Sequence, residues 1–291
     1  MLGSLIVSGF VSGSIYALIT VGLVVIYRSS RVINFAHGYV ASVAAFVGLG
    51  VITRGEQTSV WIALPIAVLA AVLVSLLVEM LVITPLRDEP PLIPVVATLG
   101  VSLILSGLLQ FAVGQGIHVM PPLVEGQAFT IFGYTLSWQQ VIIVATTFTC
   151  VALLAVFLTF TVYGTGMRAV SENRSVSSLL GINLRQVSFL SWGLGGALAG
   201  LAAFLIAPET ALTPDAFTAI LLHSFVAVVL AGFTSILGAI AGGYLAGISI
   251  NLFAGYVTGG LQETFLLCLL LVVLLSRPHG LFGKPELGGA L

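Results

Sequence analysis

The sequence predicts an all-α integral membrane protein, a polytopic helical bundle of about eight or nine transmembrane helices in one domain over residues 1–291. Of its residues, 59% are hydrophobic and only 7% are charged, whereas about a quarter of residues are charged in soluble domains. The apolar runs are long and uncharged, unlike the ~10-residue alternation of a membrane β-barrel. Thirty-three glycines fit the same class, because small residues let helices pack closely in lipid.

Charged residues and prolines divide the apolar sequence into runs near the length that a bilayer requires, about 20 residues. The first run, residues 5–27, has no basic residue before it, which indicates a retained anchor and not a secretion signal. Residues 217–251 are too long for one span and contain GFTS at 232–235, so we expect a broken helix or two short spans there. The other runs are residues 32–53, 60–83, 92–113, 138–162, 188–207 and 261–276.

Basic residues predict the orientation, since short cytoplasmic loops carry an excess of Lys and Arg. Alternating spans place the polar segment 163–187 and eight of the nine basic residues on one side, and Arg54 on the other. This predicts nine crossings, with the N-terminus outside and the C-terminus in the cytoplasm. The basic residues expected inside are Arg28, Arg31, Arg87, Arg168, Arg174, Arg185, Arg277 and Lys284.

The longest polar stretch, residues 163–187, must lie in water. Asn173 can cap a short helix there, and Gly181 can end it in left-handed backbone. Two interpretations are open: a plain connecting loop, or a docking helix that inserts its apolar face into a groove on a soluble partner. That apolar face consists of Val176, Leu179 and Leu180.

Few polar residues lie within the predicted spans. Asn34 and His37 are three positions apart, so on a helix they would share a face, and Gly38 follows directly. Polar side chains at this depth face a bundle interior or a water-filled path, although a hydrogen bond between helices would explain them equally well. No Asp lies inside a predicted span, and Glu79 and Glu263 lie near span ends.

Glycine spacing predicts close helix contacts in two spans. Rows at intervals of four residues allow two backbones to approach each other. A span broken at 232–235 would also expose helix ends near mid-membrane, a feature of transporter binding sites. The rows are Gly238 and Gly242; Ala239, Gly243 and Gly247, continued by Asn251; and Gly196 and Gly200. The candidate path residues are therefore Asn34, His37, Gly38, Gly243, Gly247 and Asn251.

Catalytic and cofactor motifs are not found in the sequence. It has no GxxxxGK[ST] loop for ATP and no recognisable nucleophile motif. Cys150 and Cys268 fall inside apolar runs, which indicates neither a disulfide framework nor a metal site. A net charge of −1 gives no reason to expect a nucleic-acid partner. We therefore expect no catalytic residue, no metal and no cofactor bound by this chain.

Four segments resemble a known family over nearly the whole chain and in the same order. They are SGFVSGSIYALITVGLVVIYRSSRVINFAHG, GTGMRAVSENRSVSSLLGINLRQV, VVLAGFTSILGAIAGGYLAG and RPHGLFG. Together they look like the integral-membrane permease of branched-chain amino acid ABC importers, of the LivH type. One departure is SVSSLLGIN, where the family often has Ala or Met at some positions and this chain has Ser177 and Ser178.

The resemblance implies one subunit of a larger transporter in the cytoplasmic membrane of a bacterium or archaeon. Such permeases pair with a second, related permease and dock two cytoplasmic ATPases, which bind ATP and Mg. They receive solute from an extracytoplasmic binding protein. Segment 163–187 then becomes a coupling helix that meets the ATPase. The residues carried over to that role by position are Gly164, Arg168, Ala169, Glu172, Asn173, Leu180 and Gly181.

The function implied is the inward transport of branched-chain, largely apolar amino acids. Two alternatives remain open. One is an ABC permease for urea, short amides, sugars or another small solute. The other is a secondary transporter or channel that works alone; the scarcity of intramembrane acids, which ion-coupled carriers commonly use, argues against it.

Overall fold

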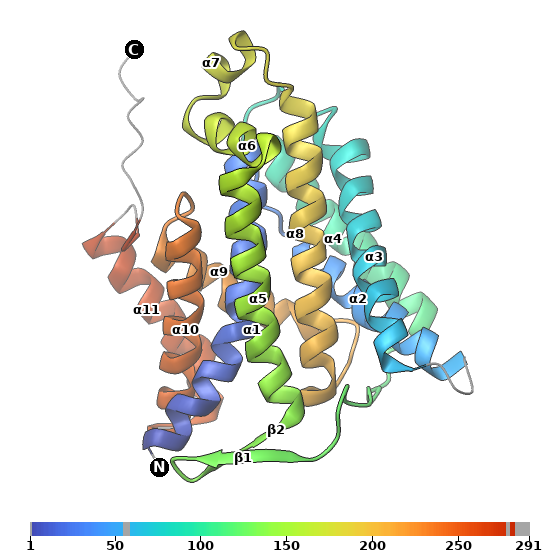
Figure 1. Cartoon of the computed structure of the whole chain (residues 1–291), viewed down its shortest axis with the longest axis vertical. Coiled ribbons are helices and arrows are strands. Elements are labelled where there is room, and N and C mark those ends of the chain that lie inside the picture. Colours follow the sequence, from blue (N-terminus) through green and yellow to red (C-terminus); the bar gives the residue numbers. More distant parts are fainter. Residues whose placement is uncertain (1, 55–58, 278–279, 283–291) are drawn as a thin grey trace.

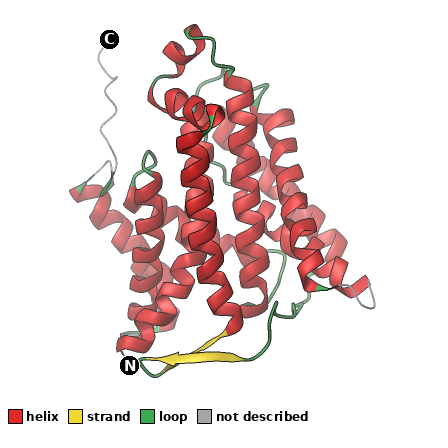
Figure 2. Ribbon diagram, viewed as in Figure 1, coloured by secondary structure: helices red, strands yellow, loops and turns green. Residues whose placement is uncertain are grey.

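The computed structural model describes residues 2–54, 59–277 and 280–282, which form a bundle of membrane-length helices (Figures 1 and 2). Within these residues, seven helices are long and apolar enough to cross a membrane, and α2 and α9 are shorter apolar helices. The predicted all-α polytopic architecture is therefore confirmed. Lys284, one of the basic residues expected inside the cell, lies outside the described residues.

The chain order begins with α1 (Leu2–Ser30), α2 (His37–Arg54), α3 (Val60–Val78), α4 (Leu92–Val113), α5 (Trp138–Phe160) and α6 (Val162–Glu172). It continues with α7 (Arg174–Leu179), α8 (Leu184–Ile206), α9 (Ala216–Ala231), α10 (Ile236–Tyr256) and α11 (Gln262–Ser276). A π-helical turn (Glu79–Ile83) extends α3, and 3-10 turns (Ala207–Glu209 and Gly259–Leu261) follow α8 and precede α11. Between α4 and α5, β1 (Gln127–Ile131) and β2 (Tyr134–Ser137) form an antiparallel hairpin.

The two ends of the bundle differ in character (Figure 1). Helices α6 and α7 lie together at one end, which we call the α7 face. The β1–β2 hairpin lies at the opposite end, which we call the hairpin face, and α1 begins beside it. The polar segment and the strands therefore occupy opposite ends of the same helices.

Helix α1 runs through the centre of the bundle. Every residue from 17 to 26 is buried, and the helix packs against α5, α8, α9 and α10. A helix that is apolar on all sides is expected to be buried on all sides. In contrast, α11 is exposed along most of its length. The first helix of the chain is thus the core around which later helices pack.

The predicted glycine rows lie at helix contacts. A Cβ on Gly247 of α10 would overlap the backbone of Gly13 in α1, and one on Gly243 would overlap the backbone of Ala17. In α8, a Cβ on Gly200 would overlap Ala71 of α3. Without side chains the backbones approach closely and gain dispersion contacts that lipid cannot supply. The prediction of close packing at these rows is confirmed.

Two sequence-based boundaries differ from the structure, and the predicted break at 232–235 is confirmed. The second span begins at His37 and not at residue 32, because residues 31–36 are irregular and start with Arg31 in left-handed backbone (φ 58°). The break at 232–235 separates α9 from α10, and the Ser235 side chain accepts from Gly238 N at 2.9 Å to begin α10. Residues 163–172, for which the sequence predicts no helix, belong to α6, since Thr161 caps that helix through Gly164 N.

We expect Gly247→Val to destabilise the protein, because the new side chain would force α10 away from α1. Overpacking of this kind costs about 1–3 kcal/mol in the free energy of unfolding. Thermal unfolding of the purified chain in detergent measures the effect. Gly107→Val is the matched control, since a Cβ there meets nothing within 4 Å. Equal unfolding midpoints for the two variants would contradict the packing argument.

Candidate functional site

Helix α2 begins inside the bundle and not at its end. Its first residue, His37, packs on Gly22 of α1: a Cβ on Gly22 would lie 3.0 Å from His37 Nε2. Gly22 precedes the last residue of α1 by eight positions, which is roughly 12 Å at 1.5 Å per residue. The irregular segment 31–36 therefore runs from the α7 face back into the bundle before α2 starts.

The backbone of this re-entrant segment is held by polar contacts. Asn34 Oδ1 accepts from Ala36 N at 3.0 Å, and Asn34 O accepts from His37 N at 3.3 Å. Thr98 of α4 donates to Ile33 O at 3.2 Å. Irregular backbone at membrane depth survives only where such partners exist within the protein. The expectation that Asn34 and His37 share a helix face is therefore wrong, because Asn34 forms the turn before the helix.

Three buried nitrogens in this region lack hydrogen-bond partners among the described residues. They are Asn34 Nδ2 and both ring nitrogens of His37. Gly38 follows and allows α9 to come close, since a Cβ there would lie 3.1 Å from Phe217 O. Buried donors and acceptors without partners are costly. Their role in a solute path stays a prediction, and their burial beside α9 is consistent with it.

A second irregular segment enters the bundle from the hairpin face. After the 3-10 turn that follows α8, Leu212 pairs with His118 through two backbone hydrogen bonds, of 2.9 and 3.1 Å. The chain then reaches Asp215, and α9 begins at Ala216 beside the start of α2. Helices α2 and α9 thus both start inside the bundle. The segment before α2 enters from the α7 face, and the segment before α9 enters from the hairpin face.

Five polar side chains form a continuous hydrogen-bonded line, which we call the polar chain. Tyr39 Oη donates to Asp215 Oδ1 at 2.8 Å, and Ser106 Oγ donates to the same oxygen at 3.4 Å. Gln110 Nε2 donates to Ser106 Oγ at 3.1 Å, and Gln115 Nε2 donates to Gln110 Oε1 at 3.2 Å. The line runs from Gln115 along α4 to Ser106, and Asp215 connects it to Tyr39 of α2.

Asp215, between Tyr39 and Ser106 in the polar chain, lies beside the first turn of α2. Tyr39, its donor, is fifteen residues from the last residue of α2, which is roughly 22 Å along the helix. Asp215 itself is exposed on the side of the bundle. Neither Asp88 nor Asp215 lies inside a membrane-length helix, as the sequence predicts, but the loop that carries Asp215 folds inward and brings it beside Tyr39 of α2.

The break at 232–235 lies elsewhere than expected. The ring of Phe233 packs against that of Tyr27 of α1 in a tilted arrangement, with centroids 4.7 Å apart, and Tyr27 is close to the α7-face end of that helix. The turn between α9 and α10 is consequently near the α7 face and not at mid-membrane. Two helices, α2 and α9, do start inside the bundle, at His37 and Ala216.

The remaining candidate path residues lie between α1 and α10. Gly243 and Gly247 touch the α1 backbone, so the contact itself explains why they are glycines. Asn251 Oδ1 accepts from Ser8 Oγ at 3.1 Å, and its Nδ2 donates to Ser12 Oγ at 3.4 Å. A path role for these three residues stays a prediction.

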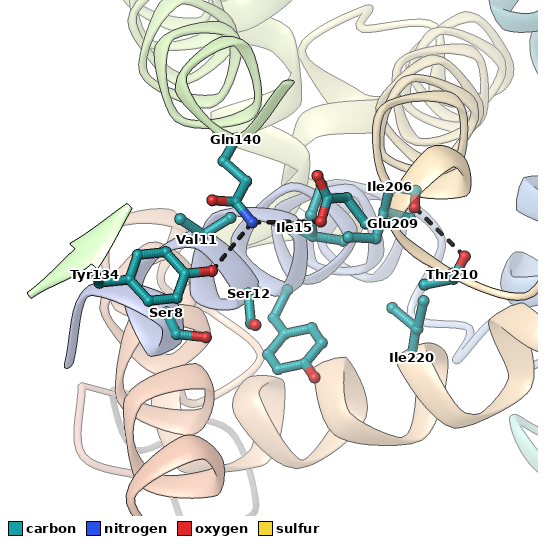
Figure 3. Close-up of a pocket in the computed structure, with 11 residues that line it drawn as sticks. Ser8, Val11, Ser12, Ile15, Tyr134, Gln140, Ile206, Glu209, Thr210 and Ile220 are labelled. Atoms are coloured by element: carbon teal, nitrogen blue, oxygen red, sulfur yellow. Dashed lines mark hydrogen bonds between the residues drawn. The ribbon is translucent and has the colours of Figure 1, made fainter. Parts of the chain in front are cut away.

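Ser8 and Ser12 also line a cavity near the hairpin face, shown in Figure 3, with a volume of about 290 Å³. Gln140 of α5 crosses one side of it and donates to Tyr134 Oη at 3.1 Å and to Glu209 Oε2 at 3.3 Å. The cavity mixes apolar walls with hydroxyl, amide and carboxylate groups. A small polar solute fits these dimensions and this lining.

At the α7 face, α6 is fastened to α1. Arg28 Nη2 donates to Ser171 Oγ at 2.8 Å, and Arg31 Nη2 donates to Ser171 O at 2.9 Å. Gly164 permits α6 to fold back on α5, since a Cβ there would overlap Phe157 O. Ala169 O accepts from Asn173 N at 3.0 Å, where α6 ends. Arg168 and Glu172 lie on the same helix, and Glu172 is exposed.

Helix α7 has the capping that the sequence predicts. The Asn173 side chain accepts from Val176 N at 3.0 Å, and Gly181 follows with φ 82°. The apolar side chains of the helix face outward: Val176 is 48% exposed, Leu179 87% and Leu180 74%. A row of exposed apolar groups on a polar segment is a candidate interaction surface.

The same face is strongly basic. Arg31, Arg87 and Arg174 line one pocket of about 100 Å³ together with Glu89. Burial lowers the pKa of the Arg174 guanidinium from its usual value; the nearby Arg87 and Arg31 charges lower it further, whereas the Asp88 charge raises it. Arginine nevertheless stays charged at neutral pH. The α7 face therefore carries a concentration of positive charge.

Comparison with known proteins identifies the family. Residues 5–275 match the family model described as branched-chain amino acid transport system / permease component. The chain belongs to this permease family. It is 30% identical to the high-affinity branched-chain amino acid transport system permease protein BraD of Pseudomonas aeruginosa, over 97% of this chain and 95% of the relative.

Two relatives named LivH, also high-affinity branched-chain amino acid transport system permease proteins, align equally fully. The Salmonella typhimurium protein is 29% identical and the Escherichia coli K12 protein 28%, each over 96% of this chain and 94% of the relative. No solved structure matches the chain significantly. The resemblance drawn from the four sequence segments is confirmed, and the permease is an integral membrane protein.

Sequence reasoning missed the polar chain of this permease. Asp215 follows Pro214 and precedes an apolar run, which is a helix-start signal. That signal predicts where α9 begins but not how deep the loop lies, because loops are expected at the surface. Ser106 and Gln110 are four apart on a predicted span, which indicates a shared face. Nothing local in the sequence connects them to Asp215.

We expect Asn173→Ala to loosen α7 without disturbing the bundle. Loss of an N-cap side chain costs about 1 kcal/mol, which corresponds to roughly five-fold faster local opening. Hydrogen exchange of the amides of residues 176–180 in the purified permease measures this. Ser175→Ala, on the same helix, leaves the cap in place and should exchange at the parent rate. Unchanged exchange in the Asn173 variant would contradict the cap assignment.

Proposed function

We propose that this permease is the membrane subunit of an ABC importer that moves branched-chain amino acids into the cytoplasm, driven by ATPase chains that dock on α7. The exposed apolar row of α7 is the observation that carries the proposal. A six-residue helix that presents Val176, Leu179 and Leu180 to water is explained by a partner groove. In this proposal the chain binds neither ATP nor Mg itself; both are held by the partner ATPases.

The charge distribution supports the orientation. The α7 face carries Arg31, Arg87 and Arg174, whereas Arg54 is at the hairpin end of α2. An excess of basic residues marks the cytoplasmic side of a membrane protein. We therefore orient the α7 face and the C-terminus toward the cytoplasm, in the inner membrane of a bacterium or archaeon. The hairpin face then points outward, toward a solute-binding protein.

A physical connection between α7 and the bundle interior supports the coupling role. Ser171, at the end of α6, is held by Arg28 and Arg31. Arg31 is also the first residue of the re-entrant segment that leads to His37. A displacement of α6 and α7 by closing ATPases would therefore act on the start of α2. Rigid-body shifts of this kind give alternating access in transporters.

The polar chain supports a second permease as partner. Polar residues at membrane depth face a protein interior or a water-filled path, and not lipid. Asp215 is exposed on the side of this single chain. A related permease placed against α2, α4 and α9 would cover it and enclose a path between the two subunits.

We expect Leu180→Lys to uncouple ATP hydrolysis from uptake, because a lysine on the apolar row would oppose insertion into an apolar groove. Double replacement with Glu172→Lys should strengthen the effect. Leucine uptake and ATP hydrolysis by the assembled transporter in vesicles are the measurements. Ser178→Lys adds the same charge on the opposite side of α7 and should keep both rates near those of the parent. Unchanged uptake by the Leu180 variant would refute the docking role.

Solute competition separates this proposal from its alternatives. Unlabelled leucine, isoleucine or valine should reduce labelled leucine uptake by the assembled transporter, whereas urea and ribose at the same concentrations should not. The permease alone in vesicles, under a sodium or proton gradient, should show no uptake. Concentrative uptake by the single chain would instead identify a secondary transporter.

A further inference from the structure

Asp215 is a carboxylate with an open oxygen. Tyr39 and Ser106 both donate to Oδ1, and no described residue donates to Oδ2. Nor does any arginine or histidine in the described part of the chain pair with it. The two hydroxyls fix the orientation of the carboxylate and leave the second oxygen exposed. A carboxylate held this way suits a ligand that brings a positive charge.

The position of Asp215, beside the first turn of α2, argues against ordinary surface solvation as an explanation. It lies beside Tyr39, roughly 22 Å along α2 from the hairpin-face end of that helix. Two side chains of α4, close in sequence to Ser106 and Gln110, are apolar and outward-facing: Leu103 is 74% exposed and Phe111 92%. A charged acid among such groups is expensive to keep and marks a substrate or ion pathway when it occurs.

The polar chain gives access to this carboxylate. Ser106 and Gln110 are one helical turn apart on α4, and Gln115 follows just beyond the end of that helix. Their hydroxyl and amide groups can replace water around a solute that moves inward from the hairpin face. Glycines 100 and 107 of α4 have open space at their Cβ positions, so α4 presents an uncrowded surface.

We propose that Asp215 receives the ammonium group of the transported solute, with Tyr39 and Ser106 as positioning residues and Gln110 and Gln115 along the approach. This inference deepens the proposed function and rests on it. It assigns the solute class to molecules with a free amino group, because urea and sugars bring no positive charge to the carboxylate. The apolar surroundings of α4 and α9 suit an aliphatic side chain.

The first test compares Asp215→Asn, Asp215→Glu and Glu125→Gln in the transporter assembled with its partner chains. Asparagine keeps the shape of the side chain but removes its charge, so uptake per ATP hydrolysed should fall roughly ten- to hundred-fold. Glutamate keeps the charge on a longer arm and should retain more uptake. Glu125→Gln removes an exposed acid outside the polar chain and should transport like the parent.

The uptake of these variants decides between the proposal and its alternatives. Parent-like uptake by the Asn variant overturns the assignment. The assignment is also overturned if uptake by the parent requires sodium and the Asn variant loses both uptake and its sodium dependence, because Asp215 would then bind the ion. If Leu180→Lys uncouples while Asp215→Asn transports normally, the proposed function stands and this inference falls. If Leu180→Lys has no effect, the proposed function falls instead. A thermal unfolding midpoint close to that of the parent shows that each variant is folded.

A cysteine in place of Asp215 distinguishes a role in solute binding from a purely structural role, because the charge at this position can be restored chemically and its effect on uptake measured. On a Cys150→Ser, Cys268→Ser background, Asp215→Cys should react with water-soluble methanethiosulfonates, because only a hydrated thiol ionises readily. Attachment of a sulfonatoethyl group restores a negative charge and should raise uptake, whereas an aminoethyl group should not. Solute-loaded binding protein should slow the modification. Failure to react, or equal effects of the two reagents, would contradict the proposal.

Discussion

Backbone polar groups at the depth of lipid must find partners inside the protein, and this constraint organises the permease. Residues 31–36 and 210–215 both leave helical structure within the bundle, and both are held by side chains or backbone of neighbouring segments. Thr98 holds the first through Ile33 O, and His118 pairs with Leu212 in the second. Burial of these two segments brings the starts of α2 and α9 together and creates the region where a solute path is proposed.

Much of the architecture follows from the sequence, because hydropathy and glycine spacing are local signals. The spans, the packed glycines of α10 and the caps of α7 are examples. Depth is not a local signal. Residues 31–36 read as the start of a span since Val32, Ile33 and Phe35 are apolar, and residues 210–215 read as a surface loop because they contain Pro214 and Asp215. Only the packing of α2 against α1 and α9 fixes where they lie.

The candidate site residues also divide into those with local roles, which the sequence predicts, and those that depend on distant segments, which it does not. Asn173 and Gly181 act within a few residues of the chain, so their roles as caps could be predicted. Asn34 is a polar residue in an apolar run and is buried, but its turn geometry depends on Ala36 and His37. The polar chain joins α2, α4 and the loop before α9, which are separated by up to 176 residues. A single sequence without homologues contains no signal for such a connection.

The central position of α1 has a consequence for biogenesis. It is made before the other described helices, yet its closest neighbours, α8, α9 and α10, follow only from residue 184 onward. The helix must therefore stay in the bilayer while Gly9 and Gly13, which α10 later covers, still face lipid, and its apolar sequence allows it to do so. Assembly of the interior thus waits for the synthesis of α10.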